Sequence, residues 1–298
     1  MFVSIGNPVY DFIQTPMVST GTRVLSGCST NACLAWAKLG EPTALVGRVG
    51  ADYAGRLTSD LTHYGIEYEL NTCAETGGFH LVYDHRGDRT LDVLGVADPI
   101  TTFPERFENA DFILIGPILG EIPLDLVAEI RQRASAPLLL DPQGFVRRAV
   151  DGRVERYRNP TIEKVIPLCE VVKANEHEAE IITGVNPRQQ GAKAVRKLHA
   201  LGCRIAIVTL AEAGSLIYDG KQMYEIPAYT TVARDPTGAG DTYAAGFIYQ
   251  YLRTPDDLRT VGYFASAVAS VMVEHTGPDF ALTLEEAKLR TQTLLKAK

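Results

Sequence analysis

The chain has 298 residues, of which 46% are hydrophobic and 22% charged, and its formal net charge is −7. This composition is ordinary for a globular protein, and no apolar run approaches the roughly 20 residues of a membrane span. An acidic balance without a run of Lys or Arg disfavours nucleic acid and anionic membranes as partners. Five cysteines without a C-x-x-C pair disfavour disulfides or a zinc site, and with no secretory leader they favour a cytoplasmic protein.

Short apolar runs alternate with segments of helical periodicity along most of the chain. The predicted strands are Val3–Ile5, Ala44–Val46, Phe112–Ile115, Leu138–Leu140, Val171–Lys173 and Ile205–Thr209. The predicted helices are Asn31–Leu39, Tyr53–His63, Leu124–Arg133, Glu176–Thr183 and Gln189–Leu201. This alternation predicts an α/β fold, in which a mainly parallel sheet carries helices on both faces and ligands lie beyond the carboxyl ends of the strands.

Two segments, residues 11–26 and 79–94, depart from this alternation. Each has two apolar stretches around a turn, with Ser19–Thr22 in the first turn and His85–Asp88 in the second, so each predicts a β-hairpin. Hairpins do not join a parallel sheet easily. We therefore expect a small separate β-sheet that forms a lid over the ligand edge, with two plain surface hairpins as the alternative.

The most informative stretch is Asp235–Asp241, which reads Asp-Pro-Thr-Gly-Ala-Gly-Asp and follows a strand-like run, Met223–Val232. A helix of small and apolar residues is predicted directly after it, over Thr242–Leu252. Two glycines let the backbone approach a ligand closely, and the start of a helix favours an anion. The carboxylate of Asp241 beside such an anion site suits a base that deprotonates an attacking alcohol. The alternative is a simple turn with Asp241 as helix cap.

This stretch resembles the C-terminal signature of the PfkB/ribokinase family of carbohydrate kinases. Shorter motifs resemble the same family in its usual order, and two of them depart from its pattern. Ser26–Asn31 resembles the Gly-Gly-x-x-x-Asn substrate loop, with Ser26 in place of the first glycine. Val208–Gly214 resembles the nucleotide-contacting turn, with Ala211 at a glycine position. The remaining matches are Gly47–Gly55, in which Asp52 is expected to cap a helix, Asn175–Glu178 for Asn-x-x-Glu, and Asp141–Arg147, whose form is most like inositol-kinase-like members.

The resemblance implies a ribokinase-like three-layer α/β sandwich over residues 1–298, with the two hairpins inserted as the lid. It implies an ATP-dependent kinase that phosphorylates an alcohol group of a small sugar, polyol or cyclitol, myo-inositol included. A nucleoside kinase or keto-sugar-acid kinase of the same fold is the alternative, and a non-catalytic sugar or nucleotide sensor is a more distant one. A homodimer is implied by analogy only.

The resemblance also implies roles for individual residues. Asp241 is the expected base, and charge on the moving phosphoryl group is stabilised by N–H groups around Gly238, Ala239 and Gly240. The acceptor is bound by Asp11, Gly27, Asn31, Gln143 and Arg147. The nucleotide is contacted by Asn175, Thr209, Gly214, Thr237 and Gly277, and Mg²⁺ is held near Glu178.

Some of these residues also have plain structural interpretations. From the residues alone, Asp11 is a turn aspartate, Asn31 a helix N-cap and Glu178 an acid favoured in a first helical turn. The lid arginines Arg86 and Arg89 either close over the substrate or remain solvated.

Overall fold

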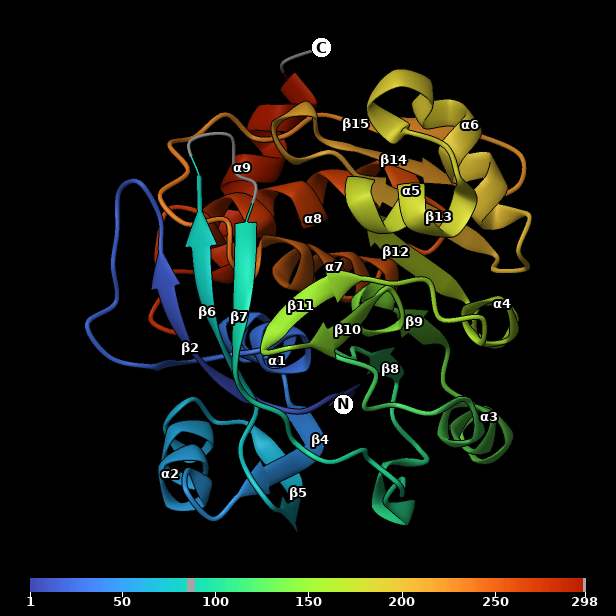
Figure 1. Ribbon diagram of the computed structural model, residues 1–298. Helices are drawn as coiled ribbons and strands as arrows, with labels where there is room; N and C mark the ends of the chain where they lie inside the picture. Colours follow the sequence, from blue (N-terminus) through green and yellow to red (C-terminus); the bar gives the residue numbers. More distant parts are fainter. Residues whose placement is uncertain (85–88, 297–298) are drawn as a thin grey trace.

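The computed structural model describes residues 1–84 and 89–296 (Figure 1). Within this part of the chain, the main sheet has the strand order β15-β14-β13-β12-β9-β8-β1-β4-β5. Neighbouring strands from β13 to β5 run parallel, and β14 and β15 run antiparallel at one edge. The bounds are β1 Phe2–Ile5, β4 Thr43–Gly50, β5 Glu67–Cys73, β8 Phe112–Ile115, β9 Leu138–Leu140, β12 Val171–Asn175, β13 Ile205–Thr209, β14 Ser215–Tyr218 and β15 Met223–Ile226.

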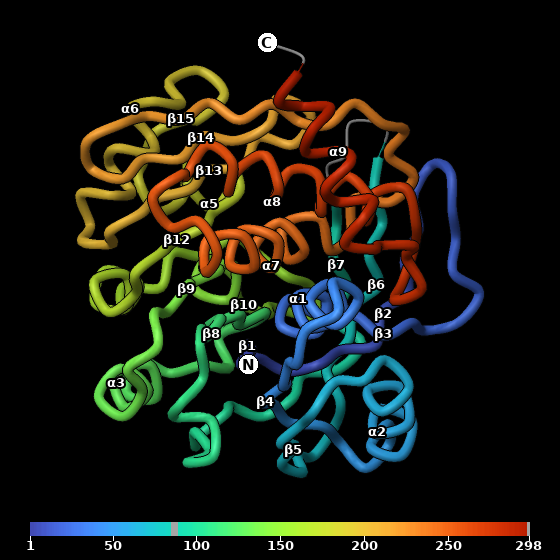
Figure 2. Tube along the Cα trace, turned by 180° about the vertical axis from the view of Figure 1, so that it is seen from behind, coloured from blue at the N-terminus to red at the C-terminus, as the bar shows by residue number. Residues whose placement is uncertain are grey.

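Helices cover both faces of the main sheet, so the predicted three-layer sandwich is confirmed. Figure 2 shows α1, α7, α8 and α9 on one face, while α3 to α6 lie on the other (Figure 1). Each face has its own apolar core, with Trp36 and Phe247 on the first and Val127 and Ile130 on the second. The bounds are α1 Cys28–Lys38, α2 Ala54–His63, α3 Leu124–Arg133, α4 Ile162–Val165, α5 Glu176–Thr183, α6 Pro187–His199, α7 Ala239–Tyr251, α8 Leu258–Met272 and α9 Leu284–Lys296. The helices among the described residues are too short or too polar to cross a bilayer.

A second, smaller sheet forms in front of the main sheet in Figure 1, with the described strand order β10-β11-β7-β6-β2-β3. The bounds are β2 Val9–Gln14, β3 Val24–Ser26, β6 Gly78–Tyr83, β7 Arg89–Gly95, β10 Arg147–Val150 and β11 Arg153–Arg156. Both predicted hairpins are present, and β2 joins them by running parallel to β6. The second turn, residues 85–88, lies outside the described residues.

The β10–β11 hairpin also belongs to this sheet, because Arg153 of β11 pairs with Asp92 of β7. We did not predict it from the sequence. Its strands are short and rich in arginine, so they lack the apolar alternation that marks a strand with a buried face.

Two local predictions about helix starts are wrong. Helix α1 begins at Cys28 after Gly27, whose φ of 115° suits glycine, so Asn31 lies inside the first turn and is not the N-cap. Helix α2 is preceded by Tyr53, and the carboxylate of Asp52 accepts hydrogen bonds from Thr76 instead of capping it. In both cases the true start depends on turn geometry that residue type alone does not show.

The segment around the glycine-rich stretch also differs from its prediction. Strand β15 ends at Ile226, so residues 227–234 form an irregular approach to the loop. Helix α7 begins at Ala239 with Gly238 as its N-cap at φ 80°. Asp241 therefore lies in the first turn of the helix, and its interpretation as the cap is wrong.

Candidate active site

The starts of α1 and α7 meet at the carboxyl edge of the main sheet. Nδ2 of Asn31, in the first turn of α1, donates a hydrogen bond of 2.9 Å to Oδ2 of Asp241 in the first turn of α7. A Cβ on Gly238 would lie 3.1 Å from the same Asn31 nitrogen, so glycine keeps this approach open. Two residues far apart in the sequence, both predicted as site residues, are thus brought into direct contact.

A buried ion pair lies beneath the start of α7. Nζ of Lys173, in β12, is 2.5 Å from Oδ2 of Asp141 at the end of β9, and both side chains are almost fully buried. A Cβ on Gly240 would lie 2.7 Å from that Nζ, so the ammonium touches the first turn of the helix. The sequence predicted Asp141 only as part of the Asp141–Arg147 motif, and it did not lead us to predict Lys173 as a site residue. The available signal was a lysine inside an otherwise apolar strand.

Asp241 lies in a strongly charged environment. Burial raises the pKa of its carboxyl group, and the negative charge of Asp141 raises it further. The Lys173 ammonium and hydrogen bonds with Asn31 and Cys28 lower the pKa, but the net shift is upward. Such a carboxylate has a higher affinity for a proton than an exposed aspartate, as a general base requires.

Glu178 and Asn175 form a capping box at the start of α5. Oδ1 of Asn175 accepts from the N–H of Glu178 over 3.0 Å, and Oε2 of Glu178 accepts from the N–H of Asn175 over 2.8 Å. The other oxygen, Oε1, lies 3.8 Å from Nη2 of Arg147. Burial, followed by the charge of Asp141, raises the pKa of Glu178, whereas Lys173 and Arg147 lower it. One carboxylate oxygen therefore remains outside the capping box.

The predicted acceptor residue Asp11 lies within the lid sheet and links two of its neighbouring strands. It is buried in β2, and its Oδ1 accepts a 2.7 Å hydrogen bond from the N–H of Phe79 in lid strand β6. Burial raises the pKa of Asp11 to about 7, against hydrogen bonds with Ser26 and Phe79 that lower it. Gln143, another predicted acceptor residue, is buried after β9, and its N–H donates to Oδ1 of Asp141.

The lid also contacts the glycine-rich loop. The hydroxyl group of Tyr83 is 2.9 Å from Oγ1 of Thr237 and accepts a 2.8 Å hydrogen bond from Nη1 of Arg89. Burial opposes the charged form of Arg89, but Tyr83, Asp241 and Glu178 raise its pKa overall. Arg89 is therefore held inside the site by Tyr83. Arg86 lies outside the described residues.

Two of the five predicted nucleotide residues lie at the ends of adjacent strands, and the other three lie in loops or turns. Asn175 and Thr209 are cross-strand partners at the ends of β12 and β13. Gly214 has φ 86°, and a Cβ there would lie 2.0 Å from the carbonyl oxygen of Ile226. Ala211 has φ 50°, a left-handed conformation that favours glycine. Gly277 lies elsewhere, against Val24 of β3.

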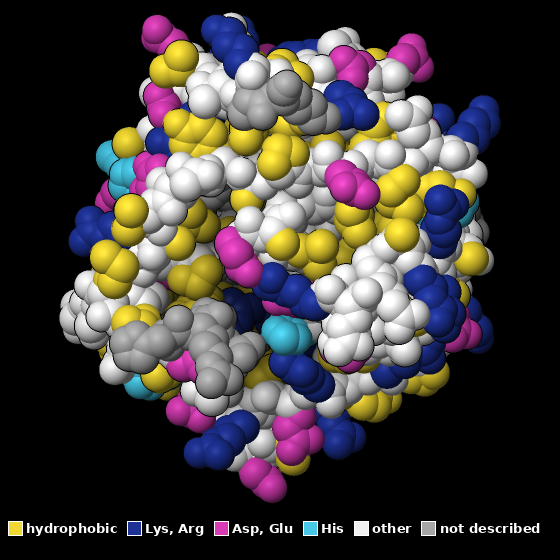
Figure 3. All heavy atoms as spheres, turned by 90° about the horizontal axis from the view of Figure 1, so that it is seen from above, with side chains coloured by type: hydrophobic (Ala, Val, Ile, Leu, Met, Phe, Trp, Pro, Cys, Tyr) yellow, Lys and Arg dark blue, Asp and Glu magenta, His cyan; other side chains and the backbone are white. Residues whose placement is uncertain are grey.

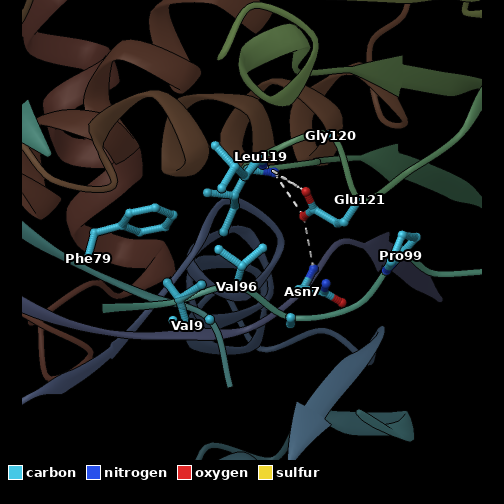
Figure 4. Close-up of a pocket in the computed structure, with 12 residues that line it drawn as sticks. Asn7, Val9, Phe79, Val96, Pro99, Leu119, Gly120 and Glu121 are labelled. Carbon is cyan, nitrogen blue, oxygen red and sulfur yellow. Dashed lines mark hydrogen bonds between the residues drawn. The ribbon is translucent and has the colours of Figure 1, made fainter. Parts of the chain in front are cut away.

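A cavity of about 130 Å³ lies where the lid meets the main sheet (Figure 4). Phe79 and Val96 line it from the lid side, and Asn7 and Glu121 from the main-sheet side. The Glu121 carboxylate accepts hydrogen bonds from the N–H groups of Asn7, Ile118 and Leu119. Because its oxygens are already engaged, Glu121 holds the loop before α3 in place. Seen from above, the molecule is hollowed, and Lys and Arg side chains gather around the hollow (Figure 3).

Known proteins resemble this chain in sequence and in fold. Residues 2–284 match the family described as pfkB family carbohydrate kinase. The chain is similar to a nucleoside kinase of Methanothermobacter thermautotrophicus, with 26% identity over 92% of this chain and 90% of the relative.

Two solved structures are similar over nearly the whole chain. One is a sulfate complex of a pyrophosphate-dependent kinase in the ribokinase family, with 25% identity, a TM-score of 0.83, and coverage of 97% of this chain and 99% of that chain. The other comes from the conversion of a pyrophosphate-dependent myo-inositol-1 kinase into a myo-inositol-3 kinase by mutation. It has 26% identity, a TM-score of 0.78, and coverage of 98% of this chain and 99% of that chain.

Proposed function

The chain belongs to the pfkB family of carbohydrate kinases, and from this premise we propose that it transfers the terminal phosphoryl group of Mg²⁺–ATP to a hydroxyl group of a small polyol or cyclitol. The observation that carries the proposal is the contact of Asn31 with Asp241 at the start of α7. It joins an expected acceptor-binding residue to the expected base, beside the backbone N–H groups of a helix start.

The chemistry follows from this arrangement. Asp241 takes the proton of the acceptor hydroxyl as its oxygen attacks the phosphorus atom, and Asn31 orients the carboxylate. The N–H groups around Gly238, Ala239 and Gly240 stabilise the charge on the transferring group. The Asp11 carboxylate, positioned by hydrogen bonds with Phe79 and Ser26, accepts hydrogen bonds from hydroxyl groups of the acceptor. Lid strand β6 encloses this side and excludes water.

The expected cofactors fit the residues at the carboxyl edge. Mg²⁺ prefers oxygen ligands and keeps part of its water shell, and Oε1 of Glu178 offers such an oxygen outside the capping box. When bound, Mg²⁺ neutralises charge on the phosphates of the donor. Asn175, Thr209 and Gly214 lie on the adjoining strand ends, where ATP is expected to bind.

A test of the metal role is the substitution Glu178→Gln. The amide keeps the side-chain shape but removes the charge, so the Mg²⁺ concentration needed for half-maximal rate is expected to rise severalfold. Titrating Mg²⁺ at fixed donor concentration measures this. An unchanged Mg²⁺ dependence contradicts the assignment of Glu178.

Inorganic pyrophosphate is a second candidate donor. Two similar structures are pyrophosphate-dependent kinases. Positive charge also surrounds the start of α7 and Glu178, and it comes from Lys173, Arg147 and Arg89. Such charge binds a chain of phosphates without any contact to a nucleobase.

A panel of donors and acceptors tests the proposed function. ATP and pyrophosphate are each combined with myo-inositol, ribose, fructose, a keto-sugar acid and a set of nucleosides, and phosphorylated products are followed by phosphorus NMR. We expect turnover with a polyol or cyclitol. Preference for a nucleoside supports the alternative suggested by the nucleoside kinase relative. No transfer to any acceptor from either donor refutes the kinase proposal.

A further inference from the structure

The buried side chain of Lys173 has no role in the transfer step proposed so far. Its relative exposure is 2%, and its ammonium lies against the first turn of α7. Lysine is seldom fully buried, because removing its charge from water is unfavourable. Pairing with Asp141 offsets part of this desolvation penalty. An apolar pair of similar volume would nevertheless stabilise the core at least as well. The position therefore calls for a reason beyond stability.

The location of the ammonium supplies that reason. Nζ of Lys173 lies close enough to the first turn of α7 that a Cβ on Gly240 would approach it to 2.7 Å. The same turn presents backbone N–H groups and the positive end of the helix dipole. Asp141 balances the ammonium on one side, and an anion on the other side would join it to the positive start of the helix. A transferring phosphoryl group is such an anion.

Nearby carboxylates keep Lys173 charged in this environment. Burial acts to lower its pKa, but Asp141, Glu178 and Asp241 raise it to well above the ordinary value. The ammonium therefore keeps its proton throughout the neutral pH range. It serves as a fixed positive charge and not as an acid or a base.

A metal ion is the competing source of positive charge at this point. Among the described residues, ligand atoms of Cys28, Asp141 and Asp241 lie within 4.8 Å of one another, as in a metal site. Oδ2 of Asp141 is already bonded to the Lys173 ammonium, and a buried thiol is a poor ligand for Mg²⁺. Lys173 thus occupies the cation position between these carboxylates.

We propose that Lys173 is a catalytic residue whose ammonium contacts a non-bridging oxygen of the phosphoryl group during transfer, while Asp141 acts as its positioning residue. The proposal rests on the phosphoryl transfer proposed above. In that step the bond from phosphorus to the donor oxygen breaks as the bond to the acceptor oxygen forms. The acceptor proton goes to Asp241, and Lys173 stays protonated before and after.

The test compares Lys173→Met, Asp141→Asn and the double variant of both. Steady-state kcat and KM are measured with the donor and acceptor that wild type uses in the panel, together with the melting temperature. Lys173→Met is expected to lower kcat by about 10²–10³-fold, the usual effect of removing one donor that stabilises transition-state charge. The exposed Lys193→Met on α6 is the matched control and is expected to keep wild-type kcat.

The double variant separates a catalytic from a structural role. It removes both buried charges, so its melting temperature is expected to return toward that of wild type. If Lys173 only neutralises Asp141, kcat also returns, and a kcat within about tenfold of wild type overturns the proposal. If Lys173 contacts the phosphoryl group, kcat stays at least a hundredfold low. Should the single variant fail to fold, the double variant decides alone. Wild type without transfer activity instead refutes the proposed function.

Discussion

The site has a floor, where α7 begins, and a lid side, where β2 meets β6. Both hold buried carboxylates, but different groups hold them in place. On the floor, Asp241 is held by Asn31, and the Asp141–Lys173 pair is buried between neighbouring strands of one sheet. On the lid side, Asp11 is held within the lid sheet by hydrogen bonds with Phe79 and Ser26. Groups expected to do the chemistry thus lie on the main sheet and its helices, and Asp11, expected to bind the acceptor, lies on the lid sheet.

This difference predicts how substitutions divide between kcat and KM. A change on the floor alters charges near the transferring phosphoryl group, which matters most in the transition state. A change on the lid side alters contacts made equally in the ground state, so it appears mainly in KM.

The largest expected effect comes from Asp241→Asn. The amide keeps the shape and the contact with Asn31 but cannot take the proton, so kcat is expected to fall by about 10²–10⁴-fold with donor affinity nearly intact. Steady-state kinetics and donor binding measure the two parts. The control is Asp125→Asn, an exposed acid in the first turn of α3. Near-normal turnover of Asp241→Asn would show that the base lies elsewhere.

A smaller effect is expected from Asp11→Asn, and it should appear in the KM of the acceptor. Losing a charged hydrogen-bond acceptor costs about 1.5–3 kcal/mol, or about 10–150-fold. Because burial raises the pKa of Asp11 to about 7, the ionised form grows as pH rises through that value. The acceptor KM of wild type should therefore fall with rising pH, and the variant should lose this dependence. A pH-independent KM in wild type contradicts the role of Asp11.

The smallest expected effect comes from Tyr83→Phe, which removes the link between Arg89 and Thr237. Each net hydrogen bond contributes about 0.5–1.5 kcal/mol, so KM for the donor should rise by about 2–10-fold with little change in kcat. Tyr157→Phe, a partly exposed residue after β11, is the control. A large fall in kcat in Tyr83→Phe would show that the lid takes part in the chemistry itself, and the distinction between floor and lid would fail.

Much of the framework was predictable from local patterns. Strands β8, β9 and β13 have the predicted bounds, because short apolar runs flanked by turns report burial directly. The Asp235–Asp241 stretch also predicted a loop that opens a helix, since glycine spacing and the following small residues are local properties. The β10–β11 hairpin and the true starts of α1 and α2 were not predictable in this way.

The sequence by itself determined the alternating α/β order, the two lid hairpins and the identity of the motif that carries Asp241. Only the tertiary structure decided which side chains meet there. Asn31 reaches Asp241 across 210 residues of chain, Tyr83 reaches Thr237 across 154, and Lys173 reaches Asp141 across 32. Periodicity shows which face of an element is buried, but contacts between distant elements depend on strand order and on how closely glycines let backbones approach.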